Sequence, residues 1–290
     1  MPCHKLFDLI SGTSGGSVVA LGVASNEQRS AEEIAQFLRI NGRRIFARPL
    51  FHRIWGLFGI IRAKYPDKGL EKALRQLFVN VRLQDALTDV LIPCFDLVDY
   101  KPIYFTRAGY GGEVLVRTAA HASFAASIFF PPVQCEFGEP ARRHVLLDAG
   151  LFVNDPALLA FIEAIHLFVE ADDVFVLSLG TGRMELSSSQ LSHRGWGLEQ
   201  MWGPVQGLLI DGQSDVTRLY LEAIAKARGK GEENLFVRMQ PGLAENDCVM
   251  DDVSREHLDK LTQVAEQYIK ENDSLLTDIC GRILERNGAF

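Results

Sequence analysis

The sequence contains no apolar run long enough to cross a membrane. Hydrophobic residues make up 47% of the 290 residues. The longest apolar runs, at 174–179 and 125–133, fall far short of the ~20 residues that a transmembrane helix needs. No apolar core of a signal peptide follows Met1. We therefore expect a cytoplasmic-type protein whose contact with membranes is at most peripheral.

Cysteine and positive charge are also scarce. The five cysteines are odd in number, scattered and never spaced as C-x-x-C, which excludes a disulfide-stapled fold and indicates reduced thiols without a zinc site. With 37 acidic against 30 basic residues, the net charge of −7 argues against general nucleic-acid binding. Gly180-Thr181-Gly182 lacks the third glycine of a dinucleotide site. We expect no metal and no other cofactor.

Short apolar runs alternate with helical patterns along the chain, which predicts an α/β fold around a mostly parallel central sheet. No internal repeat interrupts this order, so we expect one domain over 1–290, with a motif-bearing core at about 6–182 and a mostly helical part at 183–290. The predicted strands are 6–10, 90–97, 101–107, 114–117 after a hairpin turn at 109–112, 145–148, 174–179 and 235–239. The predicted helices are 17–25, 31–41, 69–78, 119–130 up to Pro131-Pro132, 156–168, 202–227 and 255–285.

A G-x-S-x-G pattern follows the first predicted strand, with Gly12, Ser14 and Gly16 at its fixed positions. A serine between a strand end and a helix start lies on a tight turn, and small neighbours let strand and helix approach each other. Its hydroxyl then stands at the positive end of the helix. The N–H of Gly15 can donate to a developing oxyanion. The pattern favours a nucleophilic serine, and the alternative is a glycine-rich turn that only packs tightly or holds a phosphate.

An aspartate ends another apolar strand. Asp148 follows 145–147 and precedes two small residues, Ala149 and Gly150. A carboxylate at the carboxyl end of a strand lies at the edge of the sheet where open α/β folds place ligands. Asp148 is therefore the candidate base for Ser14, with a structural turn aspartate as the alternative.

Together these segments resemble the patatin-like phospholipase family. The likeness runs from about 7 to 182 and includes several motifs in the family's order. These motifs are Gly12-Thr13-Ser14-Gly15-Gly16, Lys101-Pro102-Ile103-Tyr104-Phe105, Ala125 to Pro132, Asp148-Ala149-Gly150 with Asn154 and Pro156, and Val176 to Gly182.

The resemblance implies a three-layer α/β/α sandwich and a lipid acyl hydrolase that works through a Ser–Asp dyad. By the family's motifs Ser14 is the nucleophile and Asp148 the general base, while Gly12, Gly15, Gly16 and Gly150 shape the turn and the oxyanion site. The implied substrate is an acyl lipid, most readily a glycerophospholipid. Acylation of the serine precedes hydrolysis of the acyl-enzyme.

The sequence departs from the family in two places. Ala149 stands where the family usually has glycine, a change that costs little unless the position needs a positive φ. The family's glycine-rich oxyanion loop, on a strand before the nucleophile strand, has no counterpart, and its loss leaves the flank of 6–10 uncovered. The alternative function is therefore a catalytically impaired patatin-like fold that binds membranes or a partner protein.

A Ser-Asp-His triad of the α/β-hydrolase type is a lesser alternative. His166, His193 and His257 follow Asp148. That fold places several strands before its nucleophile, which the short segment before Ser14 does not supply. We expect none of the three histidines to act as the base.

The segment 41–66 combines basic and aromatic residues and has no acidic residue. Basic side chains attract anionic lipid headgroups, and Trp and Phe insert at the membrane interface. The alternative is a lid or crossover whose aromatic residues cover the core. The membrane contacts predicted from this segment are Arg44, Phe51, Trp55 and Phe58.

Overall fold

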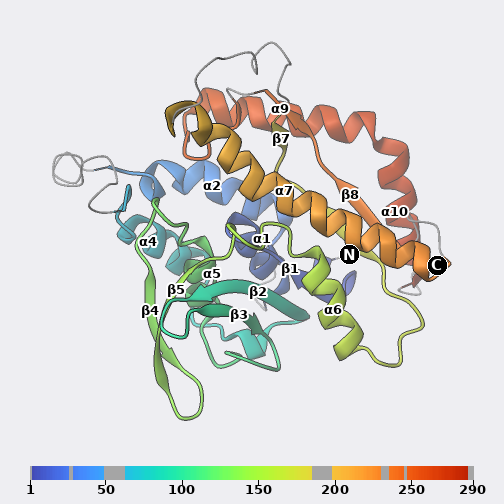
Figure 1. The fold of residues 1–290 in the computed structure, drawn as a ribbon, viewed down its shortest axis with the longest axis horizontal. Coiled ribbons are helices and arrows are strands. Elements are labelled where there is room, and N and C mark those ends of the chain that lie inside the picture. Colours follow the sequence, from blue (N-terminus) through green and yellow to red (C-terminus); the bar gives the residue numbers. More distant parts are fainter. Residues whose placement is uncertain are drawn as a thin grey trace.

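The computed structural model describes residues 2–25, 29–48, 63–184, 198–229, 235–244 and 247–286, and the side chains of α7 from Gly207 onward. Helices and short strands alternate along the chain (Figure 1). The strands are β1 (Leu9–Ser11), β2 (Asp89–Asp96), β3 (Lys101–Thr106), β4 (Val133–Phe137), β5 (Arg142–Asp148), β6 (Val176–Leu179), β7 (Arg183–Met184), β8 (Phe236–Met239) and β9 (Gly242–Leu243). The helices are α1 (Gly15–Ala24), α2 (Ala31–Ile45), α4 (Lys68–Leu77), α5 (Val116–Phe124), α6 (Ala157–Leu167), α7 (Leu198–Ala227), α9 (Arg255–Glu271) and α10 (Asp273–Arg286), with short 3-10 turns at Cys3–Lys5 and Leu83–Asp85.

The larger sheet is organised around β2, which has three partners. β1 pairs with it in parallel, whereas β3 and β5 pair with it antiparallel. Leu91 pairs with both β1 and β3, and Cys94 pairs with both β3 and β5. A strand has only two edges, so β1 and β5 share the edge of β2 that faces away from β3. Their directions are opposite, and their carboxyl ends therefore run toward each other along that edge.

The predicted three-layer α/β/α fold class is confirmed, with a mixed sheet. Parallel pairing occurs at β1–β2, β6–β8 and β7–β9, and antiparallel pairing at β2–β3, β2–β5 and β4–β5. Helices α1, α2, α4 and α5 pack on the larger sheet in one core. On β6 and β8, alternate side chains face α6 and α7 on one side and α9 and α10 on the other. The one-domain organisation stays a prediction.

Several boundaries differ from the sequence prediction. Residues 114–117 are not a hairpin strand, since α5 already begins at Val116 after a turn. α5 ends at Phe124, and 125–132 is irregular up to the unpredicted strand β4, which pairs with β5. The predicted helix 255–285 is two helices that part at Asn272. β1 also ends one residue later than predicted, so the Gly12 turn follows it directly.

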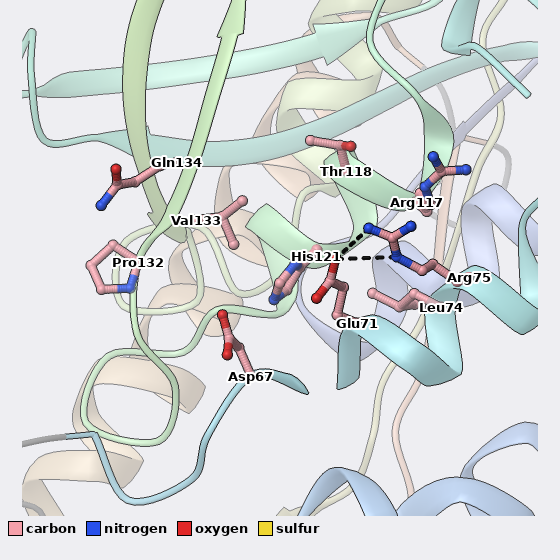
Figure 2. A pocket seen from close by; sticks show the side chains of 10 residues that line it. All are labelled: Asp67, Glu71, Leu74, Arg75, Arg117, Thr118, His121, Pro132, Val133 and Gln134. Carbon is pink, nitrogen blue, oxygen red and sulfur yellow. Dashed lines mark hydrogen bonds and ion pairs between the residues drawn. The ribbon is translucent and has the colours of Figure 1, made fainter. Parts of the chain in front are cut away.

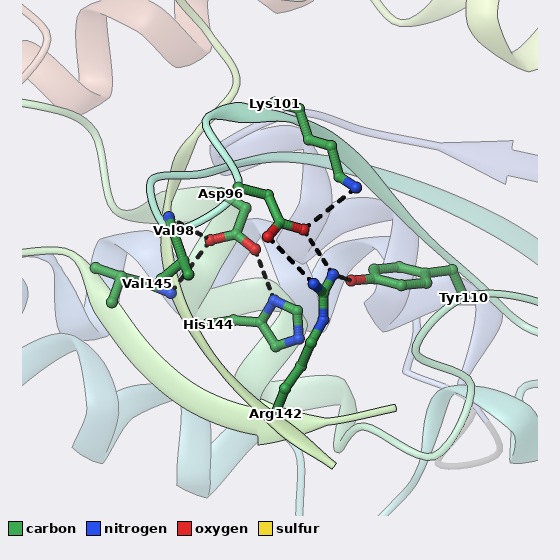
Figure 3. A network of polar contacts seen from close by, with 8 residues as sticks. Asp96, Val98, Lys101, Tyr110, Arg142, His144 and Val145 are labelled. Atoms are coloured by element: carbon green, nitrogen blue, oxygen red, sulfur yellow. Dashed lines mark hydrogen bonds and ion pairs between the residues drawn. The ribbon is translucent and has the colours of Figure 1, made fainter. Parts of the chain in front are cut away.

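A buried polar network fixes how β2 and β5 pair (Figure 3). The Nδ1 of His144 lies 2.6 Å from an Asp96 carboxylate oxygen, and both side chains are buried. Burial opposes ionisation of Asp96, but hydrogen bonds from His144 and from the N–H groups of Val98 and Val145 outweigh it and hold the pKa of this carboxyl below its usual value. Asp96 pairs with Leu146 in the β2–β5 register. The network therefore fixes β5 against β2 at Leu146, two residues before the strand ends at Asp148.

Among the described residues, no helix combines the length and the apolarity that crossing a bilayer requires.

Candidate active site

Ser14 lies in a strained turn between β1 and α1. Its backbone has φ 55° and ψ −124°, a region that residues with a side chain rarely adopt. The turn is tight because Gly12 approaches the first turn of α1, where a Cβ on Gly12 would lie 2.1 Å from the carbonyl oxygen of Gly16. The G-x-S-x-G spacing is thus explained by a contact that only glycine permits at position 12.

Asp148 is the last residue of β5 and reaches the same place from the opposite direction. Asp148 pairs with Cys94 of β2. Ser11, the last residue of β1, pairs with Leu91, which lies three residues earlier on β2. The facing ends of β1 and β5 therefore bring Ser14 and Asp148 together, and the Ser14 hydroxyl lies close enough to the Asp148 carboxylate to lower its pKa. The carboxylate accepts a hydrogen bond, 2.7 Å long, from the N–H of Gly150.

Burial dominates the electrostatics of Asp148. Only 8% of the residue is exposed, and desolvation raises its pKa to about 6, although the hydrogen bonds from Ser14 and Gly150 act in the opposite direction. The carboxylate is therefore ionised at neutral pH but more basic than an exposed one. A group in this state is suited to accept a proton from a serine hydroxyl.

The glycines of the two motifs have different local roles. Gly15 is the first residue of α1, where a backbone N–H has no partner within the helix. The N–H of Gly16 donates to the carbonyl of Thr13 over 2.8 Å. Gly150 binds the aspartate, and a Cβ there would lie 3.2 Å from its carboxylate. Gly15 is therefore the motif glycine best placed to offer an oxyanion donor.

Ser123 supports the turn around Ser14 and was not found from the sequence. Its hydroxyl accepts the N–H of Ser14 over 3.0 Å and donates to the carbonyl of Pro93 over 3.2 Å. The residue is fully buried. α5 brings it to the turn from more than one hundred positions away, so no local pattern marks it.

Replacing Ser123 with alanine is expected to slow the reaction of Ser14 about tenfold or more, because the strained turn loses the acceptor of its amide and shifts. Stability is expected to fall by about 1–3 kcal/mol, since the Ser14 N–H is left without this partner. The measurements are the rate of Ser14 modification by a fluorophosphonate and the urea midpoint.

Ser25→Ala is the matched control. Ser25 is also buried, at the end of α1, but its hydroxyl has no hydrogen-bond partner among the described residues. Its removal is expected to leave the rate unchanged. Equal rates for Ser123→Ala and the wild type would show that Ser123 does not position the nucleophile.

The loop after Asp148 is held by the carboxyl-terminal half of the chain and by the nucleophile turn. The hydroxyl of Thr13 donates to the carbonyl of Val153 over 2.7 Å. Gln213 of α7 donates to the carbonyl of Leu151 and accepts the N–H of Asn154.

An ion pair stabilises the same loop at its carboxyl-terminal end. Asp155 lies 2.9 Å from the Arg238 guanidinium, and both side chains contact the hydroxyl of Ser178. The pair joins the loop to β6 and β8. Asp155 and Arg238 were not found from the sequence, because their pairing joins segments that are far apart in the chain.

The histidine alternative finds no support in the described part of the chain. Among the described residues, the Asp148 carboxylate accepts the N–H of Gly150, and the hydroxyl that influences its pKa is that of Ser14. His166 is exposed in the last turn of α6. His257 is buried near Asp252, 4.0 Å away. His193 lies outside the described residues.

The predicted membrane contacts fall mostly outside the described residues, which exclude Phe51, Trp55 and Phe58. Arg44 is described near the end of α2, where its guanidinium donates to the side chains of Asn41 and Gln76. Its contact with lipid stays a prediction.

A hollow between α4 and α5 lies apart from Ser14 and Asp148. It has a volume of about 420 Å³, and its lining is charged and polar (Figure 2). His121 faces it, and burial lowers the pKa of this histidine. Acyl chains bind in mostly apolar pockets, and neither Ser14 nor Asp148 lines this hollow, so we do not assign it to the site. Its lining residues are Asp67, Glu71, Leu74, Arg75, Arg117, Thr118, His121, Pro132, Val133 and Gln134.

Comparison with known proteins identifies the family of the chain. A family model described as Patatin-like phospholipase matches residues 3–161, which is more than half of the sequence and spans both Ser14 and Asp148. The chain belongs to the patatin-like phospholipase family. The resemblance of the sequence motifs to this family is thereby confirmed.

Patatins and patatin-like proteins of plants are similar to this family member over most of its length. Patatin-like protein 6 of Arabidopsis thaliana is 27% identical over 92% of the chain, and the chain spans 58% of that protein. Patatin group J-1 of Solanum tuberosum is 30% identical over 91% of the chain, with 73% of its own length covered. Patatin-2-Kuras 1 of the same species is 29% identical, with 91% and 76% covered.

Proposed function

We propose that this patatin-like chain is a lipid acyl hydrolase of the phospholipase A type, with Ser14 as nucleophile and Asp148 as general base. One observation carries the proposal: a serine in a strained strand–helix turn lies beside a buried aspartate whose pKa is raised. A weak nucleophile with an adjacent base is the arrangement that acyl transfer requires. Glycerophospholipids are the proposed substrates, in keeping with the family's name.

The reaction follows from this geometry in two steps. The Ser14 oxygen attacks the acyl carbonyl while its proton passes to Asp148, and the N–H of Gly15 stabilises the negative charge on the carbonyl oxygen. The ester C–O bond then breaks, and the leaving alcohol takes the proton from Asp148. Asp148 next accepts a proton from water, whose oxygen attacks the acyl-serine. The bond between the acyl group and the Ser14 oxygen then breaks, Asp148 returns the proton to that oxygen, and the fatty acid is released.

Covalent labelling with a fluorophosphonate tests the proposal directly. The serine oxygen displaces fluoride from phosphorus, so an adduct located by peptide mass reports whether Ser14 is activated. We expect one adduct on Ser14 of the wild type and none in Ser14→Ala, with matching release of fatty acid from phosphatidylcholine. An unlabelled but folded wild type that also releases no fatty acid would overturn the proposal and favour the alternative, a fold that binds lipid or protein without catalysis.

A further inference from the structure

The outward face of α7 is apolar. Between Gly207 and Ala225 every exposed residue has an apolar or aromatic side chain, and Leu208, Leu219 and Tyr220 are 70%, 56% and 58% exposed. Their spacing along the helix places them on one face. These residues, called the α7 stripe below, are Leu208, Leu209, Val216, Leu219, Tyr220 and Ala223.

This pattern is the reverse of an ordinary surface helix, which turns charged residues to solvent. The buried side of α7, with Leu221 and Ala225, packs against α6 and β8. Between Leu208 and Ala223 its charged residues lie to one side, where Asp215 pairs with Arg183 and Arg218 with Glu222. The exposed Lys226 follows on the stripe's own face in the last turn of the helix. The stripe itself contains no charge. Contiguous exposed apolar surface of this kind marks a contact with another molecule.

The stripe borders the candidate active site. Gln213 lies on α7 between Leu209 and Val216 and binds the loop that follows Asp148 at two points. Leu151 of that loop is itself 53% exposed. α7 runs across the near side of the molecule (Figure 1). A surface that contacts the stripe would therefore contact the loop that follows the proposed base.

We propose that the α7 stripe docks the protein on a neutral lipid surface and so delivers acyl lipids to Ser14; this rests on the proposed function. The charge of the protein indicates which kind of lipid surface the stripe binds. A stripe without charged residues, in a protein of net charge −7, complements a zwitterionic bilayer, whereas an anionic bilayer would repel it. Apolar side chains that enter the interface supply the affinity.

Flotation with phosphatidylcholine vesicles tests this docking face. Leu208→Gln/Leu219→Gln keeps helix-forming residues but removes two of the most exposed side chains of the stripe. We expect this variant to bind the vesicles at least about tenfold more weakly than the wild type. Binding of the wild type should not weaken when salt is raised, since screening acts only on charges. Ile269→Gln is the matched control, because Ile269 is an exposed apolar residue of α9 that lies outside the stripe.

Two enzymatic readouts separate docking from catalysis. The double variant should lose hydrolysis of phosphatidylcholine vesicles in proportion to binding, and keep wild-type hydrolysis of a soluble butyrate ester. Ser14→Ala should bind vesicles like the wild type, so failure of the proposed function would not alter the docking result. Wild-type vesicle binding by the double variant would overturn the docking proposal. Binding only to anionic vesicles, or a wild-type dimer that the double variant converts to monomer, would overturn it as well.

Discussion

Replacing Asp148 with asparagine is expected to slow acyl release about 10³-fold, while the protein stays folded. The loss follows because asparagine has nearly the same shape as aspartate but takes up no proton, and a positioned base contributes about 10²–10⁴-fold. The measurement is fatty-acid release from phosphatidylcholine, with circular dichroism to show that the fold is kept. Release at the wild-type rate would show that Asp148 is not the base.

The same substitution is expected to stabilise the protein at pH 8. The pKa of Asp148 is raised to about 6 in the folded state by burial, so the folded state holds more protons than the unfolded state between about pH 4 and pH 6. Stability therefore falls as pH rises through this window. Asparagine has no carboxylate to bury in ionised form. We therefore expect the free energy of unfolding, measured with urea, to rise by about 2 kcal/mol at pH 8 and to stay unchanged near pH 4.

Asp155→Asn is the control for that gain. Asp155 is a buried aspartate of the same loop, but it is paired with Arg238 and Ser178. Its neutral variant should therefore lose stability at pH 8, because the guanidinium keeps its charge without its partner. A loss in both variants would mean that the carboxylate of Asp148 does not destabilise the fold.

The wild-type rate should depend on the ionisation of the proposed base. Acyl release from a soluble ester is expected to rise with pH and to reach half its maximum near pH 6, where the Asp148 carboxyl loses its proton. Above that pH Asp148 is ionised and can accept a proton from the serine. Below it the carboxyl group is already protonated and cannot.

Gly12→Ala is expected to disrupt both the fold and the site. The new Cβ would meet the carbonyl oxygen of Gly16 at 2.1 Å and the amide of Ser17 at 2.8 Å. Both are backbone atoms, so α1 must move away from β1. We expect a loss of about 3 kcal/mol in stability and roughly a 10²-fold slower modification of Ser14 by a fluorophosphonate, since a shift of about 1 Å has effects of that size.

Gly16→Ala provides the matched comparison within the same motif. A Cβ at Gly16 would meet no atom within 4 Å, and the residue lies in the first turn of α1. Alanine favours helix over glycine, so stability should stay level or rise slightly. A Gly16→Ala variant as unstable as Gly12→Ala would show that steric contact does not explain the glycine at position 12.

Local patterns predicted the parts of the site that depend on neighbouring residues. The turn around Ser14 depends on Gly12 and on the start of α1, all within a few positions, and the apolar run before Asp148 predicted its place at a strand end. The direction of β5 was not predictable in this way. It depends on pairing with β2, about fifty positions earlier, and on the buried Asp96–His144 pair. Ser123 and Arg238 were missed for the same reason, since each acts across a long separation in sequence.

The errors in the fold have local causes. Pro131-Pro132 ends no helix, because the chain already leaves α5 at Phe124. β4 follows directly and shows alternating burial from Val133 to Phe137, a pattern that the sequence contains but that no predicted strand covers. The break between α9 and α10 at Asn272 occurs without proline or glycine, so a continuous helical pattern concealed it.

The loop that carries Asp148 has a consequence for dissecting the chain into fragments. A piece that ended at residue 161 would keep both halves of the dyad and the whole of the family match. It would lack Ser178, Gln213 and Arg238, which hold that loop from outside. If such a fragment were inactive, the cause would be the loss of the contacts that hold the loop, not the absence of Ser14 or Asp148. Deletion mapping would then wrongly assign catalysis to the carboxyl-terminal helices.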